Sequence, residues 1–173
     1  MPVPYTPAQL SALERDAFLA AVGSVFEHSP WVMARAWALR PFATRADLDA
    51  ALVKVIRDAG RDELLALIGA HPELAGKAAI RGDLTADSAR EQAGAGLNAC
   101  SPEEFALIQR LNRAYQARFG WPFIVAVKGM SRHDIIAAME RRLPQTPEEE
   151  FVEALAQILR IAGFRLDDLV SDV

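Results

Sequence analysis

The sequence predicts an all-α protein, and three observations support that prediction. Capping sequences that start helices recur along the chain, and the apolar residues after them fall at helical spacing. A single segment, residues 123–127, has the composition of a strand, and one strand without a partner forms no sheet. We therefore expect about eight helices in a single compact domain that spans residues 1–173.

The strongest helix starts share one pattern, in which proline directly follows a hydroxyl residue and glutamine or glutamate stands three residues after that hydroxyl residue. This pattern is a capping box with proline in the first turn of the helix. It occurs at Thr6, Ser101 and Thr146. Weaker starts of the same kind stand at Ser29, Thr44, Thr85 and Ser131.

Taken in chain order, the predicted helices follow these starts. The first four span residues 7–22, 30–39, 45–58 and 61–70. The next four span residues 86–98, 102–118, 132–142 and 147–169. The last helix has the clearest apolar stripe, made by Phe151, Leu155, Ile158, Leu159, Ala162, Leu166 and Leu169.

Composition and charge exclude several classes of function. The chain is 51% hydrophobic and 24% charged, which is typical of a globular domain. Its net charge of −4 argues against a nucleic-acid partner, which needs a basic surface, and the one dense basic cluster is Arg141-Arg142. The longest apolar run, residues 121–127, is too short to cross a membrane. With one cysteine, Cys100, and no visible signal peptide, we expect a soluble, cytoplasmic protein without disulfides.

No metal site is predicted. The three histidines, His28, His71 and His133, lie far apart in the sequence and form no HExxH pattern. No GxSxG nucleophile elbow occurs either. We expect Cys100, which has no histidine near it in the sequence, to be a buried or neutral thiol.

The first candidate functional residue is His71. Pro72 disfavours helix at the residue before it, so the imidazole is expected to leave the preceding helix and to face a crevice. The alternative is a histidine that interacts with the last carbonyls of that helix. The sequence pattern by itself favours this second interpretation.

A second candidate is a polar triplet. Ser88, Glu91 and Gln92 stand at positions i, i+3 and i+4, so they share one face of the helix that begins after Thr85. Small residues surround them, which suits a helix that lines a pocket, but such a triplet also suits a solvated face. The pattern leaves these two interpretations equally open.

The third candidate is an arginine in the last helix. Arg160 and Arg165 both interrupt its apolar stripe. An arginine at such an edge more often extends to water, yet a guanidinium in a crevice suits bidentate binding of a carboxylate. Composition does not choose between these roles.

Six sequence motifs together resemble one family, and they occur in the family's order from about residue 8 to residue 170. They are Phe26-Glu27-His28-Ser29-Pro30-Trp31-Val32, the segment from His71 to Lys77, Leu84-Thr85-x-x-Ser88-x-x-Glu91-Gln92, Leu111-Asn112-x-x-Tyr115, the segment from Arg118 to Ile124, and Val127-Lys128-Gly129. The chain resembles the OHCU decarboxylases, which act on 2-oxo-4-hydroxy-4-carboxy-5-ureidoimidazoline in the uric acid pathway.

The resemblance implies a cofactor-free, all-α decarboxylase, usually a homodimer, that acts on this small-molecule substrate and releases CO2 and (S)-allantoin. It implies catalytic roles for His71 and Glu91. It also implies substrate contacts for Pro72, Ser88, Gln92, Gly120, Trp121, Phe123, Ile124 and Arg165. The hydrolase that precedes this step in the pathway, 5-hydroxyisourate hydrolase, is the expected pathway partner.

Two features depart from the family pattern. Trp121 stands where the family most often has phenylalanine, and residues 142–145 replace its usual Arg-Leu-x-Asn with Arg-Leu-Pro-Gln, which we expect to matter little. Trp121 leaves room for an enzyme of the same fold that acts on a related imidazoline or ureido acid. A second alternative is a helical binding module that has lost the chemistry.

Overall fold

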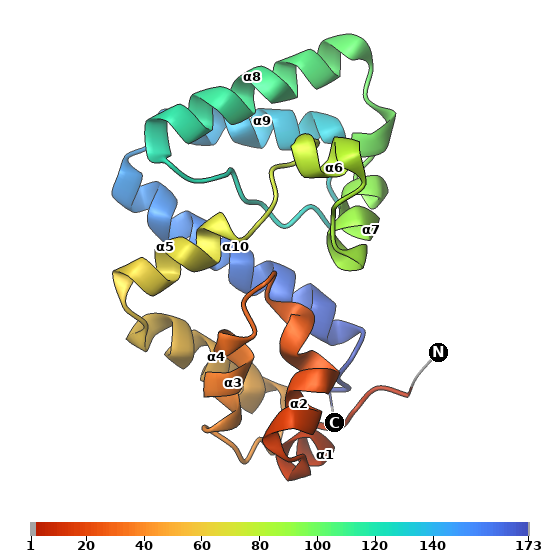
Figure 1. Ribbon diagram of the computed structural model, residues 1–173, viewed down its shortest axis with the longest axis vertical. Coiled ribbons are helices and arrows are strands. Elements are labelled where there is room, and N and C mark those ends of the chain that lie inside the picture. Colours follow the sequence, from red (N-terminus) through yellow and green to blue (C-terminus); the bar gives the residue numbers. More distant parts are fainter. Residues whose placement is uncertain (1–2, 173) are drawn as a thin grey trace. The chain divides into compact units, whose positions relative to one another are not determined.

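The all-α prediction is confirmed. The computed structural model describes residues 3–172, and within that range the regular structure consists of helices (Figure 1). The helices are α1 (Pro7–Ala12), α2 (Arg15–Val22), α3 (Trp31–Trp37), α4 (Arg45–Asp58), α5 (Arg61–Gly69), α6 (Lys77–Arg81), α7 (Ala86–Gly94), α8 (Pro102–Phe119), α9 (Arg132–Arg142) and α10 (Pro147–Asp167), with short 3-10 turns η1 (Gly23–Val25) and η2 (Leu97–Ala99). Over residues 3–172, no helix is both long and apolar enough to span a membrane.

Several predicted helices start where the structure starts them, because the capping groups are local. At Thr44 and Ser131 the side-chain hydroxyl accepts a hydrogen bond from the backbone N–H three residues later. The side chain of the aspartate at that position accepts one from the backbone N–H of the cap residue. The boxes at Thr6 and Ser101 form in the same way. Ser29 is different, because its hydroxyl donates to the Glu27 carbonyl (2.9 Å) and α3 starts without a side-chain cap.

The single predicted helix over residues 7–22 is wrong. Leu13 and Glu14 are extended, with ψ of 141° and 158°, and they separate α1 from α2. The carbonyl that this break leaves at Leu13 accepts a hydrogen bond from the indole Nε1 of Trp37, 3.0 Å away. The break is therefore stabilised by Trp37, 24 residues further along the chain, and local sequence patterns do not reveal this contact.

The segment between α5 and α7 also differs from the sequence prediction. It contains α6, which was not predicted, and the predicted helix over residues 86–98 ends at Gly94, before the separate turn η2. Gly96 enters the left-handed region between them, with φ of 79°. The helix therefore stops four residues earlier than its apolar pattern indicates.

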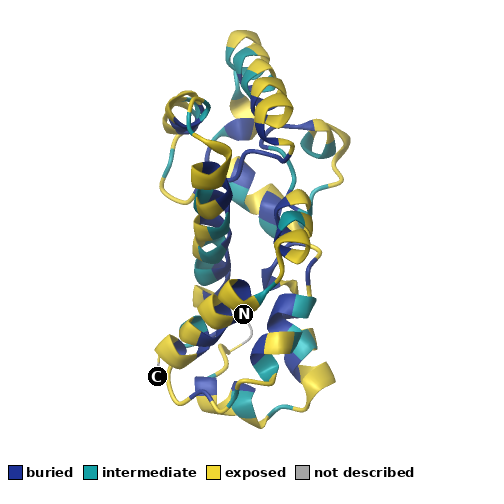
Figure 2. Cartoon of the chain, turned by 90° about the vertical axis from the view of Figure 1, so that its left-hand side faces the viewer, coloured by how far each residue is buried: buried dark blue, intermediate teal, exposed yellow. Residues whose placement is uncertain are grey.

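Packing of the backbone divides the described chain into two compact units. Unit 1 comprises the described residues up to Ala70 together with those from Leu159 onward, and unit 2 comprises His71–Ile158. The prediction that residues 1–173 act as one domain stays a prediction. In Figure 2 buried and exposed positions alternate along the helices, so the helices bury one face and expose the other.

In unit 1, helices α2, α3 and α4 pack together around buried apolar side chains. Phe18 and Phe42 are fully buried there, with ring centroids 6.4 Å apart. The two ends of the unit meet in an isolated parallel bridge, in which the Tyr5 N–H donates to the Leu169 carbonyl and the Ser171 N–H donates to the Tyr5 carbonyl, both at 2.9 Å.

In unit 2, α8 and α9 lie side by side (Figure 1). An aromatic cluster, defined as Tyr115, Phe119, Trp121, Phe123 and Phe151, joins α8 to the segment after it and to α10. Residues 121–127 are all buried and form no strand, as expected of a strand-like sequence without a partner. This buried segment must satisfy its backbone polar groups with side chains instead of a sheet.

Candidate active site

His71 lies outside the helix that precedes it. Helix α5 ends at Gly69, and His71-Pro72 begins an irregular segment that leads to α6. The residue is 8% exposed, so it is buried although it stands on a connecting segment. The structure thus agrees with the prediction that Pro72 excludes His71 from the helix.

The segment after Pro72 makes a tight turn. Ala75 lies in the left-handed region, with φ of 50°, which is unfavourable for a residue that carries a Cβ. At Gly76 a Cβ atom would lie 2.7 Å from the Cβ of Glu73, closer than carbon atoms approach, so glycine is required there. Such a conformation persists only when neighbouring groups hold it.

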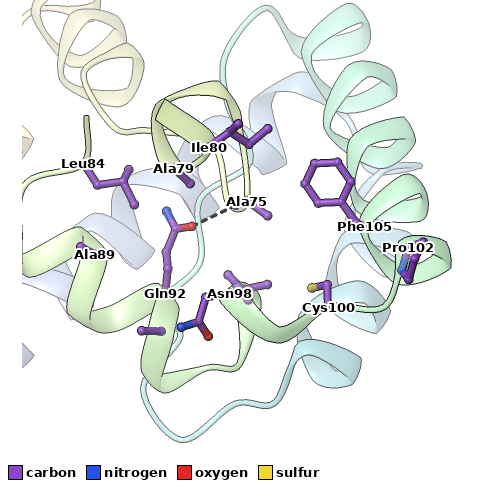
Figure 3. Close-up of a pocket in the computed structure, with 12 residues that line it drawn as sticks. Ala75, Ala79, Ile80, Leu84, Ala89, Gln92, Asn98, Cys100, Pro102 and Phe105 are labelled. Atoms are coloured by element: carbon purple, nitrogen blue, oxygen red, sulfur yellow. Dashed lines mark hydrogen bonds between the residues drawn. The ribbon is translucent and has the colours of Figure 1, made fainter. Parts of the chain in front are cut away.

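Three side-chain amides hold this turn. The Ala75 N–H donates to Oε1 of Gln92 at 2.9 Å, and Nε2 of Gln92 donates to the Glu73 carbonyl at 3.4 Å. Gln109 donates to the Ala75 carbonyl at 2.5 Å, and Asn112 donates to the Leu74 carbonyl at 2.9 Å. We call Gln92, Gln109 and Asn112 the amide clamp. Figure 3 shows the bond between Gln92 and Ala75.

The polar triplet of α7 is not a solvated face. Ser88 and Gln92 are each 6% exposed, and Glu91 beside them is half-buried. Thr85 caps the helix by accepting from the Ser88 N–H at 3.3 Å, which fixes the rotation of α7 in its first turn. Of the two interpretations that the sequence left open, a solvated face does not fit Ser88 and Gln92, and Gln92 lines the cavity described below.

Residues 120–124 start where α8 ends. Gly120 has φ of 84° and donates its N–H to the Gln116 carbonyl at 2.8 Å, which is a left-handed helix end. Trp121, Phe123 and Ile124 after it are buried. The Trp121 ring lies 5.8 Å from Phe119, so it packs inside the aromatic cluster.

A buried ion pair holds the carbonyl of Ile124. Nη1 of Arg142 donates to this carbonyl at 2.6 Å, while Nε donates to Glu150 at 2.9 Å. The Tyr115 hydroxyl donates to the same carboxylate at 2.6 Å, and burial, followed by this hydrogen bond, raises the pKa of Tyr115 well above its usual range. The guanidinium carbon also lies 4.3 Å from the centre of the Phe123 ring.

Sequence reasoning missed this group, because it treated Arg142 as half of a surface basic cluster. Arg142 is in fact buried at the end of α9, whereas its neighbour Arg141 is exposed. The available signal was Glu150, which stands four residues before Ala154 and eight before Ile158 and therefore continues a buried stripe of α10. A carboxylate at such a position needs a buried cation.

Arg165 and Arg160 differ in environment. Arg160 is exposed, with its guanidinium 5.9 Å from the Phe164 ring centre, as expected of an arginine that extends to water. Arg165 is buried in unit 1, where Nη1 donates to Glu27 at 3.0 Å and to the Val25 carbonyl at 3.2 Å. Glu27 belongs to a motif that the sequence analysis quoted but was not predicted as a site residue.

The predicted site residues fall into both units. Unit 2 contains His71, Pro72, Ser88, Glu91, Gln92, Gly120, Trp121, Phe123 and Ile124. Unit 1 contains Arg165. Over residues 3–172 no group of three His, Cys, Asp or Glu side chains is arranged to hold a metal ion.

A cavity of about 580 Å³ lies in unit 2 beside the amide clamp (Figure 3). Its walls come from α6, α7, η2 and the start of α8, and they are largely apolar, with Gln92 and Asn98 among the polar members. Cys100 also lines it, and burial raises the pKa of this thiol. A raised pKa keeps the thiol neutral, in agreement with the sequence prediction.

Comparison with known proteins gives consistent matches. Residues 11–167 match the family model described as OHCU decarboxylase. The chain is 40% identical over 166 residues to 2-oxo-4-hydroxy-4-carboxy-5-ureidoimidazoline decarboxylase of Haloferax volcanii, with 96% of each chain covered. It is 39% identical over 168 residues to the uric acid degradation bifunctional protein PucL of Bacillus subtilis, covering 97% of this chain and 33% of that one.

A solved structure matches as well. The crystal structure of (S)-allantoin synthase superposes with a TM-score of 0.75 at 28% identity. The match covers 95% of this chain and 54% of the other, so the present chain spans about half of that longer one.

Proposed function

The chain belongs to the OHCU decarboxylase family, and from that premise we propose how its residues carry out the reaction. It is a carboxy-lyase that decarboxylates 2-oxo-4-hydroxy-4-carboxy-5-ureidoimidazoline to allantoin in urate degradation. We propose that the product is the (S) enantiomer and that the reaction uses no cofactor.

The substrate itself supplies what a cofactor would otherwise provide. Its carboxylate and hydroxyl share one carbon, which is next to an imine carbon. When the bond to CO2 breaks, the neighbouring C=N accepts the electron pair. The protein then has to hold the carboxylate out of the ring plane, polarise the hydroxyl or the imine, and deliver a proton to one face.

His71 and Glu91 handle the protons in this proposal. An imidazole both accepts and donates protons near neutral pH, and acid–base help of this kind contributes roughly 10²- to 10⁴-fold to rate. The burial of His71 supports the role, because a buried connecting segment fixed by side-chain amides holds its groups in one geometry. Ser88 and Gln92 on the same helix as Glu91 are proposed to contact the substrate.

Arg165 binds the substrate carboxylate in this proposal. Its contacts with Glu27 and the Val25 carbonyl fix Nη1, and thus orient the plane of the guanidinium. Bidentate recognition of a carboxylate requires such a fixed plane. The main chain of residues 120–124 borders the substrate ring in this proposal. Arg142 holds this segment by its hydrogen bond to the Ile124 carbonyl.

A single observation carries the assignment of residues. The polar groups to which the family resemblance gives a role are buried or half-buried, where an ordinary surface residue would be exposed. Gln92 and Arg165 are held in these positions by hydrogen bonds with Ala75 and Glu27. The proposal also treats both units as one domain, since the family model spans residues 11–167 without interruption.

The test generates the unstable substrate in place with urate oxidase and the hydrolase that follows it, and records optically active allantoin by circular dichroism. The parent chain gives a rapid signal of the (S) product. We expect His71→Ala to lose that signal and Glu91→Gln to slow it, with melting temperatures unchanged. His133→Ala, which removes an exposed histidine, is the matched control. A fully active His71→Ala chain contradicts the proposed site.

We also propose that the chain forms a homodimer, acts in the cytoplasm and works alongside the preceding hydrolase. PucL, a bifunctional protein of uric acid degradation, carries a region similar to this chain in one third of its length, which supports the pathway link. Light scattering coupled to size exclusion tests the dimer, and a mass of one chain at working concentration rejects it.

A further inference from the structure

We propose that Asn112 and Gln109 are positioning residues for His71, acting through the turn that follows it. The inference rests on the proposed function, because it takes His71 to be the residue that moves the proton. Both residues belong to α8, and each donates a hydrogen bond to a main-chain carbonyl of the turn that follows His71.

Four hydrogen bonds join side-chain amides to the main chain of this one turn. Three successive carbonyls, those of Glu73, Leu74 and Ala75, each accept a hydrogen bond from a side-chain amide, and the Ala75 N–H donates to a fourth amide atom. In a helix or a sheet, backbone partners would satisfy these groups. Here α7 and α8 supply them, so the conformation of the turn is set by those two helices.

The backbone of the turn is strained. Ala75 has φ of 50° although it carries a Cβ, and the next residue is a glycine packed against Glu73. A turn of this kind relaxes when its outside contacts are removed. The two amides of α8 are therefore needed to keep the conformation.

The connection between the turn and His71 is short. Pro72 has a fixed φ, and Glu73 alone stands between it and the carbonyls that α8 holds. Few free dihedral angles separate the held turn from the imidazole, so a shift of the turn moves His71 with it. The supporting helix is firm, since α8 has a capping box at Ser101 and a left-handed end at Gly120.

Asn112 holds the turn directly, because it is 3% exposed and its amide nitrogen donates to the Leu74 carbonyl at 2.9 Å. Gln109, one turn earlier on α8, is half-buried. It therefore tolerates an isosteric change without a packing defect.

The experiment compares Gln109→Glu and Asn112→Ala with Gln116→Glu, a matched change at an exposed position of the same helix. Gln109→Glu keeps the shape but sets a carboxylate oxygen against the Ala75 carbonyl. Since a displacement of about 1 Å costs roughly 100-fold, we expect kcat to fall by about 10- to 100-fold in both clamp variants while KM stays near the parent value. The pH profile of kcat shifts in these variants, and amide exchange of the segment 73–77 becomes faster.

Folded clamp variants with the parent's kcat and pH profile overturn the proposal, and so does a raised KM with unchanged kcat, which would indicate a binding role. If Asn112→Ala does not fold, Gln109→Glu decides. His71→Ala is measured in parallel. An active His71→Ala chain overturns the proposed site and this inference together, whereas an inactive one beside clamp variants with parental activity overturns this inference alone.

Discussion

Removal of the Glu150 carboxylate should strongly destabilise the protein. Glu150 is 0% exposed and accepts hydrogen bonds from the Arg142 guanidinium and the Tyr115 hydroxyl. In Glu150→Ala the buried guanidinium keeps its charge and loses its counter-charge. Breaking a buried pair by removing one partner costs about 3–5 kcal/mol.

For a chain of this length, each kcal/mol corresponds to roughly 2–4 °C in melting temperature, so we expect a decrease of about 6–20 °C. Thermal unfolding followed by circular dichroism measures it, and urea unfolding gives the free energy directly. Glu140→Ala, which removes an exposed carboxylate of α9, should leave both values near those of the parent.

A second variant separates loss of charge balance from loss of volume. The double change Arg142→Met with Glu150→Leu removes both charges and keeps apolar bulk, so it should recover much of the lost stability. Its activity should still be reduced, because no side chain then holds the Ile124 carbonyl. A Glu150→Ala chain that melts within a degree or two of the parent refutes this account of the pair.

Two further predictions concern the proposed substrate-binding arginine and a surface ion pair. Arg165→Ala should raise KM by about 10- to 100-fold, which is the loss expected when a charge-assisted carboxylate contact is removed. Arg160→Ala, the control, should leave KM unchanged. Steady-state kinetics measure both, and equal effects of the two changes contradict the assignment. The second concerns Glu63, whose pKa is lowered to about 2 by hydrogen bonds from Arg35 and then from the Gly60 N–H. Since the folded pKa lies below the ordinary value of 4.5, the stability that the ionised Glu63 contributes is present above pH 4.5 and is lost as the pH falls towards 2. Melting curves of Glu63→Gln and the parent should therefore differ at pH 7 and converge near pH 2.

Local sequence signals predicted helix starts well and helix interruptions poorly. The boxes at Thr44 and Ser131 use atoms within three residues, so their helices begin where the sequence places them. The break after α1 depends on the indole of Trp37, and no pattern within residues 7–22 contains that information. Contacts between distant segments decide such breaks.

The same distinction applies to the site. Periodicity put Ser88, Glu91 and Gln92 on one face, but their burial depends on how α7 packs. The roles of His71 and Arg165 came from the family resemblance, because the sequence pattern favoured a helix-end role for His71 and did not choose between the two roles of Arg165. The amide clamp was beyond prediction, since Asn112 stands 38 residues from the carbonyl that it holds.

The bridge between Tyr5 and Val170 has a consequence for protein engineering. Because the two segments joined by this bridge run in parallel, with backbone hydrogen bonds of 2.9 Å, the first and last described segments of the chain lie next to each other. A short linker between them would close the chain into a ring, which allows new ends to be cut elsewhere. A reporter fused upstream of Tyr5 and another fused downstream of Val170 would therefore be attached close together, near enough to interact.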